Sequence, residues 1–356
     1  MITGDPATTG PQPAAAAGTS VALTVMLPVR NEERYIYGTL AQLHDQTLSP
    51  SVYEVIVADG ESTDGTRAEI ARFVADHPQF PVRVFANSRR LSSAGRNIAV
   101  NNGRGEYFLL FDGHVHIPDQ RLLDLALALA HAYGALCLGR PQPLDPPDAS
   151  AFQQAVALAR RSPLAHSGES HIYSDFDGWV SPISVGVMYH RSVFERAGLF
   201  DESFDAAEDL EFNYRLEKAG IRCYLSPALT VTYYPHESLR ALFRQLSRYG
   251  YRRSLFLGKH PERFRIEVAV PALFVVSVAA FATAALFSSV AGVMLAALAV
   301  VYGGLVLLEG TRLAGPGARG KSVQLALIIA TVHSGLGVGF LRGGLRIHRG
   351  SGVAGP

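Results

Sequence analysis

The stretch Val55-Ile-Val-Ala-Asp59 is a short, β-branched apolar run that ends in a carboxylate. Its length and composition predict a buried strand over residues 54–58. Three further runs of this kind occur in the first third of the chain, over 21–27, 82–86 and 107–111. Helical patterns separate them, over 33–46, 66–74 and 94–101. This alternation predicts an α/β domain whose sheet is parallel and covered on both faces.

Two carboxylates follow predicted strands directly. Asp59 comes after the strand at 54–58 and Asp112 after the strand at 107–111, and each precedes a glycine. Ligands of open α/β sheets bind outside the carboxyl ends of the strands, so these side chains are the first candidates for chemistry. A nucleobase needs a hydrogen-bond acceptor, and a diphosphate needs a divalent cation held by oxygen ligands. The two strand ends therefore predict a site for a nucleotide and a cation.

The charge of the chain is divided along its length. Residues 237–356 carry 14 Lys/Arg and 4 Asp/Glu, whereas residues 1–236 carry 18 and 27. An acidic front and a basic, apolar back predict a soluble domain attached to an anionic membrane. Residues 1–20 have no basic segment before an apolar core, so we expect a disordered tail and not a signal peptide, with the large domain in the cytosol. Residues 346–356 are expected to form a second tail.

Three uncharged stretches near the C-terminus cover 268–287, 290–308 and 323–341. Each is about as long as a ~30 Å hydrocarbon core requires of a helix, and together they predict a membrane region over 263–345. Buried core helices are the less favoured alternative. The linker before the third stretch is basic, which places it in the cytosol by the positive-inside rule; its cations are Arg312, Arg319 and Lys321.

The third stretch fits this rule less well. If it crosses the bilayer, three arginines behind it lie outside the cell: Arg342, Arg346 and Arg349. Its glycine-rich segment 333–339 permits close helix packing or partial insertion. Two spans followed by a re-entrant or interfacial third segment is therefore an alternative to three spans.

A basic amphipathic helix is predicted ahead of the first span, within 237–262. Arginine recurs at every fourth position, at Arg240, Arg244, Arg248 and Arg252. Apolar side chains occupy another face: Leu239, Leu242, Phe243 and Leu246. This pattern is typical of a helix that lies at the level of the lipid headgroups, and the adjoining span favours that interpretation over a solvated helix.

Five motifs occur in a fixed order. They are Pro28-Val-Arg-Asn-Glu32, Val57-Ala-Asp-Gly-Glu-Ser-Thr-Asp-Gly-Thr66, Ala94-Gly-Arg-Asn97, Phe111-Asp-Gly-His114 and Glu208-Asp-Leu-Glu-Phe-Asn-Tyr-Arg215. In this order they resemble family-2 glycosyltransferases of the Rossmann-like GT-A fold, over about residues 21–260. The Asp-Gly-His triplet and the apolar C-terminal region look most like the bacterial exopolysaccharide branch of the succinoglycan-biosynthesis type. The resemblance implies a nucleotide-sugar-binding GT-A domain over 21–236.

The resemblance implies a role for each matching residue. The nucleotide pocket would consist of Pro28, Arg30, Glu32 and Asp59, with Asp59 accepting a hydrogen bond from the base of a UDP- or GDP-sugar. Arg96 would lie close to the donor phosphates, and Asp112 would bind a divalent cation, Mn²⁺ or Mg²⁺. Asp209 would be the general base that activates the acceptor hydroxyl for an inverting displacement, with Glu208 beside it on the acceptor side.

Two histidines are further candidates for the cation site. His114 replaces the aspartate that usually closes the metal triplet, and it would bind the cation, contact the diphosphate, or do neither. His236 would provide another ligand or a donor to the diphosphate, or be a capping or surface residue.

The acceptor side has its own candidates. Gln245-Leu-Ser-Arg248-Tyr249 is similar to the Gln-x-x-Arg-Trp motif of processive members, with Tyr in place of Trp. Two or three spans cannot enclose a polysaccharide channel, so transfer of a single sugar is favoured. Gln245, Arg248 and Tyr249 would border the acceptor or dock the helix on the membrane. Trp179, within the polar segment 161–184, would stack on a sugar or pack in the core.

The leading hypothesis is transfer of one sugar to a polyprenyl-diphosphate-linked saccharide during assembly of an exopolysaccharide or cell-surface glycan. A polyprenyl-phosphate monosugar synthase and a catalytically silent nucleotide-sugar-binding scaffold are the alternatives. We expect a multi-pass protein of the inner or plasma membrane, with its catalytic domain in the cytosol and no nucleic-acid partner. Cys137 and Cys223 provide neither a disulfide framework nor a metal-binding spacing.

Overall fold

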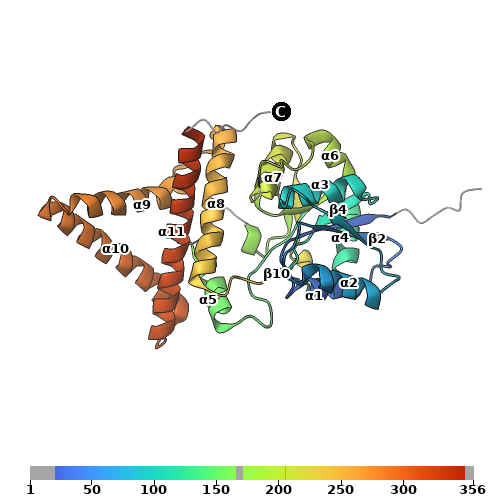
Figure 1. Ribbon diagram of the computed structural model, residues 1–356, viewed down its shortest axis with the longest axis horizontal. Helices are drawn as coiled ribbons and strands as arrows, with labels where there is room; N and C mark the ends of the chain where they lie inside the picture. The colour runs from blue at the N-terminus through green and yellow to red at the C-terminus, as the bar shows by residue number, and fades with distance from the viewer. Residues whose placement is uncertain (1–20, 166–170, 205, 349–356) are drawn as a thin grey trace, which may run out of the picture.

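The computed structural model describes residues 21–165, 171–204 and 206–348 (Figure 1). The predicted tail at 1–20, nearly all of the predicted tail at 346–356 and part of the segment 161–184 lie outside these ranges. The domain boundaries predicted above remain predictions.

An eight-stranded sheet forms the centre of the first part of the chain. Its strand order is β3-β2-β1-β4-β8-β6-β9-β7. The strands are β1 (Leu23–Val29), β2 (Tyr53–Asp59), β3 (Val82–Ala86), β4 (Tyr107–Leu110), β6 (Cys137–Gly139), β7 (Gly178–Val180), β8 (Gly186–His190) and β9 (Cys223–Leu225). Two short strands, β5 (Val115–His116) and β10 (Thr232–Tyr233), pair separately as an antiparallel ribbon.

The prediction of a parallel sheet is correct for one half only. The strands β3, β2, β1 and β4 are parallel, but β8 is antiparallel to both β4 and β6, and β7 is antiparallel to β9. The sheet is therefore mixed. Strands that are buried on both faces have the same apolar pattern in either direction, so the sequence pattern could not distinguish the two arrangements.

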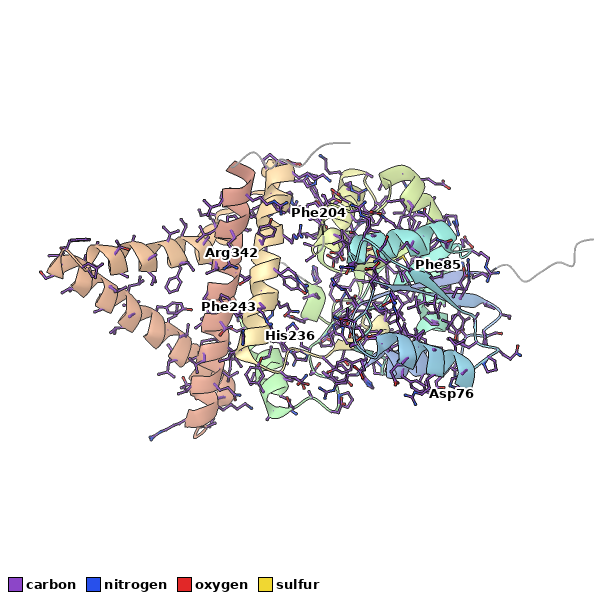
Figure 2. The ribbon with its side chains drawn as sticks, in the orientation of Figure 1. Asp76, Phe85, Phe204, His236, Phe243 and Arg342 are labelled. Atoms are coloured by element: carbon purple, nitrogen blue, oxygen red, sulfur yellow. The ribbon has the colours of Figure 1, made fainter. Side chains whose placement is uncertain are left out.

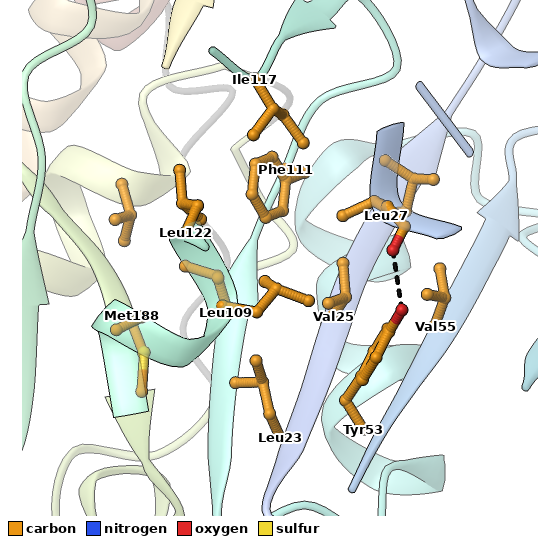
Figure 3. Close-up of a cluster of buried hydrophobic side chains, with 14 of the residues drawn as sticks. Leu23, Val25, Leu27, Tyr53, Val55, Leu109, Phe111, Ile117, Leu122 and Met188 are labelled. Carbon is orange, nitrogen blue, oxygen red and sulfur yellow. Dashed lines mark hydrogen bonds between the residues drawn. The ribbon is translucent and has the colours of Figure 1, made fainter. Parts of the chain in front are cut away.

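Both faces of the sheet are covered, as predicted. Alternate residues of β1 point to opposite sides: Leu23, Val25 and Leu27 belong to one core and Met26 to the other. The first core includes α1 (Ile36–His44), α2 (Thr66–Asp76) and α4 (Leu122–Tyr133), and Figure 3 shows its centre, where the Tyr53 hydroxyl donates to the Leu43 carbonyl at 2.7 Å. The second core includes α3 (Ser92–Asn102), α6 (Arg191–Ala197) and α7 (Glu208–Lys218).

Five helices form the remaining part of the molecule: α5 (Ala151–Arg160), α8 (Leu239–Lys259), α9 (Ile266–Ala284), α10 (Ser289–Ala314) and α11 (Arg319–His348). Figure 1 shows α8 and α11 standing side by side next to the sheet domain, with α9 and α10 projecting away from it as a hairpin. The last three helices are long and apolar enough to cross a membrane. Arg312, Arg319 and Lys321 lie in the ends of α10 and α11, so the linker between these helices is shorter than predicted.

Candidate active site

The carboxyl ends of β1 and β2 form one edge of the site. The strands are in parallel register, with Pro28 opposite Ala58 and Val29 opposite Asp59. The two loops behind them are joined by Asn31, whose side-chain oxygen accepts from the Thr63 amide at 2.8 Å and whose backbone amide donates to the Ser62 hydroxyl. Asn31 and Glu61 both have a left-handed backbone (φ 58° and 53°), a conformation that non-glycine residues adopt at a cost and that clusters at binding sites.

The predicted nucleotide residues lie at this edge in different environments. Asp59 is buried, and its carboxylate accepts from Arg67 Nε at 2.5 Å and from the Ser62 amide at 3.1 Å. Arg30 is exposed and packs over Gly60, where an added Cβ would lie 3.3 Å from the Arg30 side chain. Pro28 packs against Gly95 of α3. The structure thus brings Pro28, Arg30 and Asp59 together, and it gives Asp59 an arginine partner that the sequence did not indicate.

The Asp112-Gly113-His114 triplet follows β4 and packs against Glu32 in the loop behind β1. His114 Nδ1 lies 2.9 Å from Glu32 Oε1, and Gly113 packs so closely on Glu32 that an added Cβ would be 2.7 Å from Glu32 Cγ. Burial disfavours the charged ring of His114. The hydrogen bond to Glu32 and the charges of Glu32 and Asp112 outweigh this effect, so the pKa of His114 lies above its ordinary value. Glu32 is therefore the hydrogen-bond partner of His114 as well as a residue of the loop behind β1.

His236 lies near the triplet, although it follows the last strand of the domain in the sequence. It follows β10, and β10 pairs with β5 immediately behind His114. Burial, followed by the charges of His114, Arg248 and Arg244, lowers the pKa of His236. Figure 2 shows His236 at the junction of α8 with the sheet domain.

The Glu208-Asp209 pair begins α7, on the face of the sheet that α3 also covers. Ala207, directly before it, has φ 62°, a left-handed conformation that is strained for alanine and turns the chain into the helix. Glu208 is buried and its carboxylate lies 3.0 Å from Arg96 Nη2, whereas Asp209 is exposed and accepts from the Leu210 amide. The two adjacent carboxylates thus have opposite environments.

The charge of Asp112 acts on Glu208 and on its partner Arg96. Burial and the charges of Asp209 and Asp112 raise the pKa of Glu208, although the charge of Arg96 opposes them. Burial opposes the charge of Arg96, but Glu208, Asp209 and Asp112, in that order, raise the pKa of its guanidinium. Asp112 and Asp209 therefore lie close to the same buried arginine. Whether Arg96 also contacts donor phosphates remains a prediction.

Arg140 was not predicted from the sequence. It follows β6, and its guanidinium is fully buried, donates to the Leu110 carbonyl at 2.8 Å and the Tyr233 hydroxyl at 3.2 Å, and lies over the Phe111 ring. It thus holds the segment that leads into Asp112. The sequence contained a signal, because Arg140 is a polar residue directly behind an apolar run, as Asp59 and Asp112 are.

The helix α8 lies next to the site, on the side of the apolar helices (Figure 1). Tyr249 is 41% exposed, and Gln245 Nε2 lies 3.4 Å from its hydroxyl. Burial, followed by the charge of Asp209, raises the pKa of Tyr249, and the charges of Arg248 and Arg160 oppose this change. Gln245, Arg248 and Tyr249 therefore form a group next to Asp209.

Trp179 lies elsewhere. It belongs to the edge strand β7, is half-buried against Tyr224 with their rings 5.5 Å apart, and shares a shallow pocket with Glu217 at the C-terminal end of α7. Asp209 is at the opposite end of that helix. The contacts of Trp179 fit the packing alternative better than sugar stacking, which stays a prediction.

No group of three or more His, Cys, Asp or Glu is close enough to hold a metal ion by itself within residues 21–165, 171–204 and 206–348. The donors that converge are Asp112, with His114 and His236 nearby. A cation at Asp112 would therefore need further ligands from the bound substrate or from water.

The mixed sheet has Pro28 and Asp59 at neighbouring strand ends, and Asp112 and the acidic start of α7 both lie near the buried Arg96. This arrangement is that of the GT-A class of nucleotide-sugar transferases. The family model described as glycosyl transferase family 2 matches residues 24–217, and that of glycosyl transferase family group 2 matches residues 156–333. The chain belongs to glycosyl transferase family 2 and is a glycosyltransferase.

Relatives of known name agree with this assignment. The succinoglycan biosynthesis protein ExoA of Rhizobium meliloti (strain 1021) is 33% identical over 247 residues, covering 68% of this chain and 72% of its own. A dolichyl N-acetyl-α-D-glucosaminyl phosphate 3-β-D-2,3-diacetamido-2,3-dideoxy-β-D-glucuronosyltransferase of Methanococcus voltae is 25% identical over 244 residues, covering 67% and 74%. A mannosyltransferase of Pyrobaculum calidifontis, solved with GDP-Man and Mn²⁺, has the same fold, with a TM-score of 0.58 at 21% identity over 93% of this chain and 90% of its own.

Proposed function

We propose that the protein transfers one sugar from a nucleoside-diphosphate donor to a lipid-linked saccharide, with inversion, during assembly of an exopolysaccharide or cell-surface glycan. The observation that carries this proposal is the buried pair of Arg96 with Glu208 at 3.0 Å, next to which Asp112 and Asp209 lie. Tyr249 of α8 lies within reach of the same two charges, so the strand ends of the sheet and a helix of the apolar region share one site. The names of two relatives, one in succinoglycan biosynthesis and one acting on a dolichyl phosphate-linked sugar, support this acceptor class.

Asp209 is the general base of the proposed reaction. It is exposed at the first turn of α7, and the one hydrogen bond that its carboxylate accepts among the described residues comes from Leu210. The second carboxylate oxygen is thus free to take the proton of an acceptor hydroxyl, which then attacks the anomeric carbon from the face opposite the departing nucleotide. Glu208 cannot share this role because it is buried against Arg96.

The donor set suits Mn²⁺ or Mg²⁺. These ions often use one or two carboxylates and complete their shell with substrate phosphates and water, so the absence of a full protein cluster in the described ranges is compatible with them. Asp112 would hold the ion together with His114 Nε2, because Glu32 occupies Nδ1 and fixes the ring, as carboxylates hydrogen-bonded to metal-binding histidines do. When bound, the ion would neutralise the charge that develops on the leaving diphosphate.

Replacement of His114 by Ala is expected to weaken Mn²⁺-dependent nucleotide binding by about 10- to 100-fold, the range typical of losing a ligand or its support. Titration calorimetry with the nucleoside diphosphate, with and without Mn²⁺, measures the change without requiring turnover. His116→Ala is the matched control, since His116 lies two residues further on in β5. Equal affinities of the His114→Ala variant and the unaltered protein would remove His114 from the cation site.

A panel of radiolabelled nucleotide sugars tests the function as a whole. Membranes that contain the protein are incubated with each donor and either lipid phosphate or lipid-linked saccharide, with and without a chelator. We expect one donor to label the lipid-linked saccharide, and the chelator to abolish the labelling. Labelling of the lipid phosphate alone would identify a monosugar synthase, and donor binding without transfer to any lipid would identify a silent scaffold.

The membrane attachment is part of the proposal. Arg160 and Arg248 lie near Tyr249 and have no ion-pair partner in the described part of the chain, so they are available to lipid phosphates. Together with the three apolar helices, they support a protein of the inner or plasma membrane whose catalytic domain is cytosolic.

A further inference from the structure

The helix α11 differs from α9 and α10 in what covers its apolar surface. Within the apolar segments of α9 and α10, 6% and 11% of the residues are buried inside the protein, whereas the value for α11 is 44%. The side chains of α9 and α10 therefore need another apolar environment, which a bilayer provides. The apolar composition of α11 is explained largely by contacts with protein.

The principal contact of α11 is with α8. Three glycines four residues apart face that helix: Gly335, Gly339 and Gly343. A Cβ added at Gly339 would collide with the Ser247 carbonyl, and one at Gly343 would lie 2.6 Å from the Tyr251 carbonyl. The backbones touch, as in other small-residue helix interfaces. The residue numbers of the contacting positions increase together in the two helices, from Ser247 with Gly339 to Tyr251 with Gly343. The helices therefore run parallel and side by side, as Figures 1 and 2 show.

The helix α8 is fixed to the catalytic domain near both ends. At its N-terminal end, Glu237 pairs with Arg34 at 2.5 Å. At its C-terminal end, Lys259 pairs with Asp201 and Glu211, each at 2.7 Å. A helix held in this way runs across the surface of the domain. Since the domain lies outside the bilayer, α8 lies outside the hydrocarbon core.

The middle of α11 also contacts the segment behind α5, where His333 Nε2 donates to the carbonyl of Leu164 at 2.6 Å. The helix α5 packs on α11 and is itself tied to the end of the sheet domain, because Gln153 Nε2 donates to the Pro235 carbonyl at 2.7 Å. His333 Nδ1 lies 3.0 Å from the hydroxyl of Tyr302 in α10. If α11 crossed the bilayer, its midpoint would lie at the centre of the hydrocarbon, where Leu164 could not reach it.

We propose that α8 and α11 together form a two-helix platform in the cytosolic headgroup layer, and that the α9–α10 hairpin alone enters the hydrocarbon core. The 19 residues of α9 extend about 28 Å, close to the thickness of that core. The hairpin projects from the side of α11 opposite the sheet domain (Figure 1). The platform places Tyr249 and the nearby Asp209 at the membrane surface, where a lipid-linked acceptor presents its headgroup.

The platform removes the conflict with the positive-inside rule. Arg319 and Lys321 are at one end of α11, and Arg342 and Arg346 are at the other. In a crossing helix, one of these pairs would lie on the outside. In the platform, both pairs lie on the cytosolic side of the membrane, where a cation near the anionic surface contributes about 1 kcal/mol of attraction.

Cysteine labelling tests the platform. Gly320→Cys and Gly344→Cys mark the two ends of α11, Ser289→Cys marks the tip of the hairpin, and exposed Ser51→Cys marks the catalytic domain. The added side chains at 320 and 344 meet no atom closer than 3.9 Å, and the native Cys137 and Cys223 are fully buried. A membrane-impermeant maleimide is applied to intact cells and to inside-out vesicles.

We expect Gly344→Cys to be labelled in the same preparation as Ser51→Cys and Gly320→Cys, and Ser289→Cys in the other. Labelling of Gly344→Cys together with Ser289→Cys would show that α11 crosses, and would overturn the platform. Alkaline phosphatase fused behind Pro356 provides a second measurement: it should stay inactive, and an active fusion would also overturn the proposal. The inference rests on the membrane attachment in the proposed function, but neither measurement requires sugar transfer, so the two can fail separately.

Discussion

Replacement of Asp209 by Asn is expected to lower the rate of sugar transfer by about 10³-fold while donor affinity stays nearly unchanged. General-base catalysis typically contributes 10²- to 10⁴-fold, and an amide cannot accept the proton of the acceptor hydroxyl. The amide oxygen can still accept the hydrogen bond from Leu210, so the start of α7 is preserved. Turnover is measured with saturating donor and acceptor, and donor affinity by calorimetry.

Glu217→Gln is the matched control, because it removes one carboxylate from the opposite end of the same helix. Glu217 pairs with Arg263 at 3.2 Å and has no contact with the cleft residues among those described. We expect normal turnover and normal donor affinity for this variant. Undiminished transfer by Asp209→Asn would refute the assignment of the base, and a loss of donor affinity would instead place Asp209 in the donor site.

The strand ends could be predicted from the sequence because their signal is local. A short run rich in β-branched residues, such as 55–58, favours a buried strand, and a carboxylate directly behind it then lies at the edge of the sheet. The direction of β8 could not be predicted in this way, since it depends on the path of the chain between β4 and β8. The packing of α11 on α8 is a similar case, because an apolar helix has the same composition whether protein or lipid covers it.

The pairings within the site were harder to predict than its residues. His114 and Glu32 are 82 positions apart, and each has several suitable partners in the sequence. Only the fold shows that the triplet packs against the loop behind β1. The ion pair of Arg96 with Glu208 likewise depends on α3 and α7 packing on the same face of the sheet. Sequence motifs identify the residues of a site, whereas tertiary packing decides which of them touch.

Replacement of Arg96 by Met is expected to destabilise the protein by about 3–5 kcal/mol, the usual cost of removing one partner of a buried ion pair. Glu208 would remain buried without its cation. The pKa of Glu208 already lies above its ordinary value, and the loss of Arg96 raises it further. A carboxyl group whose pKa is higher in the folded state than in the unfolded state destabilises the fold at every pH above the unfolded pKa. Lowering the pH toward the unfolded pKa should therefore reduce the difference in the free energy of unfolding between the variant and the unaltered protein.

The double variant Arg96→Met/Glu208→Gln provides the control for charge. It replaces both ions with uncharged side chains of similar size, and exchanging a buried ion pair for neutral groups is often tolerated. We therefore expect it to melt at a higher temperature than Arg96→Met alone, and to lack the added pH dependence. Thermal unfolding in detergent at several pH values measures both effects. If the double variant is as unstable as the single one at every pH, the destabilisation comes from lost packing around Arg96, and the buried charge of Glu208 is not its cause.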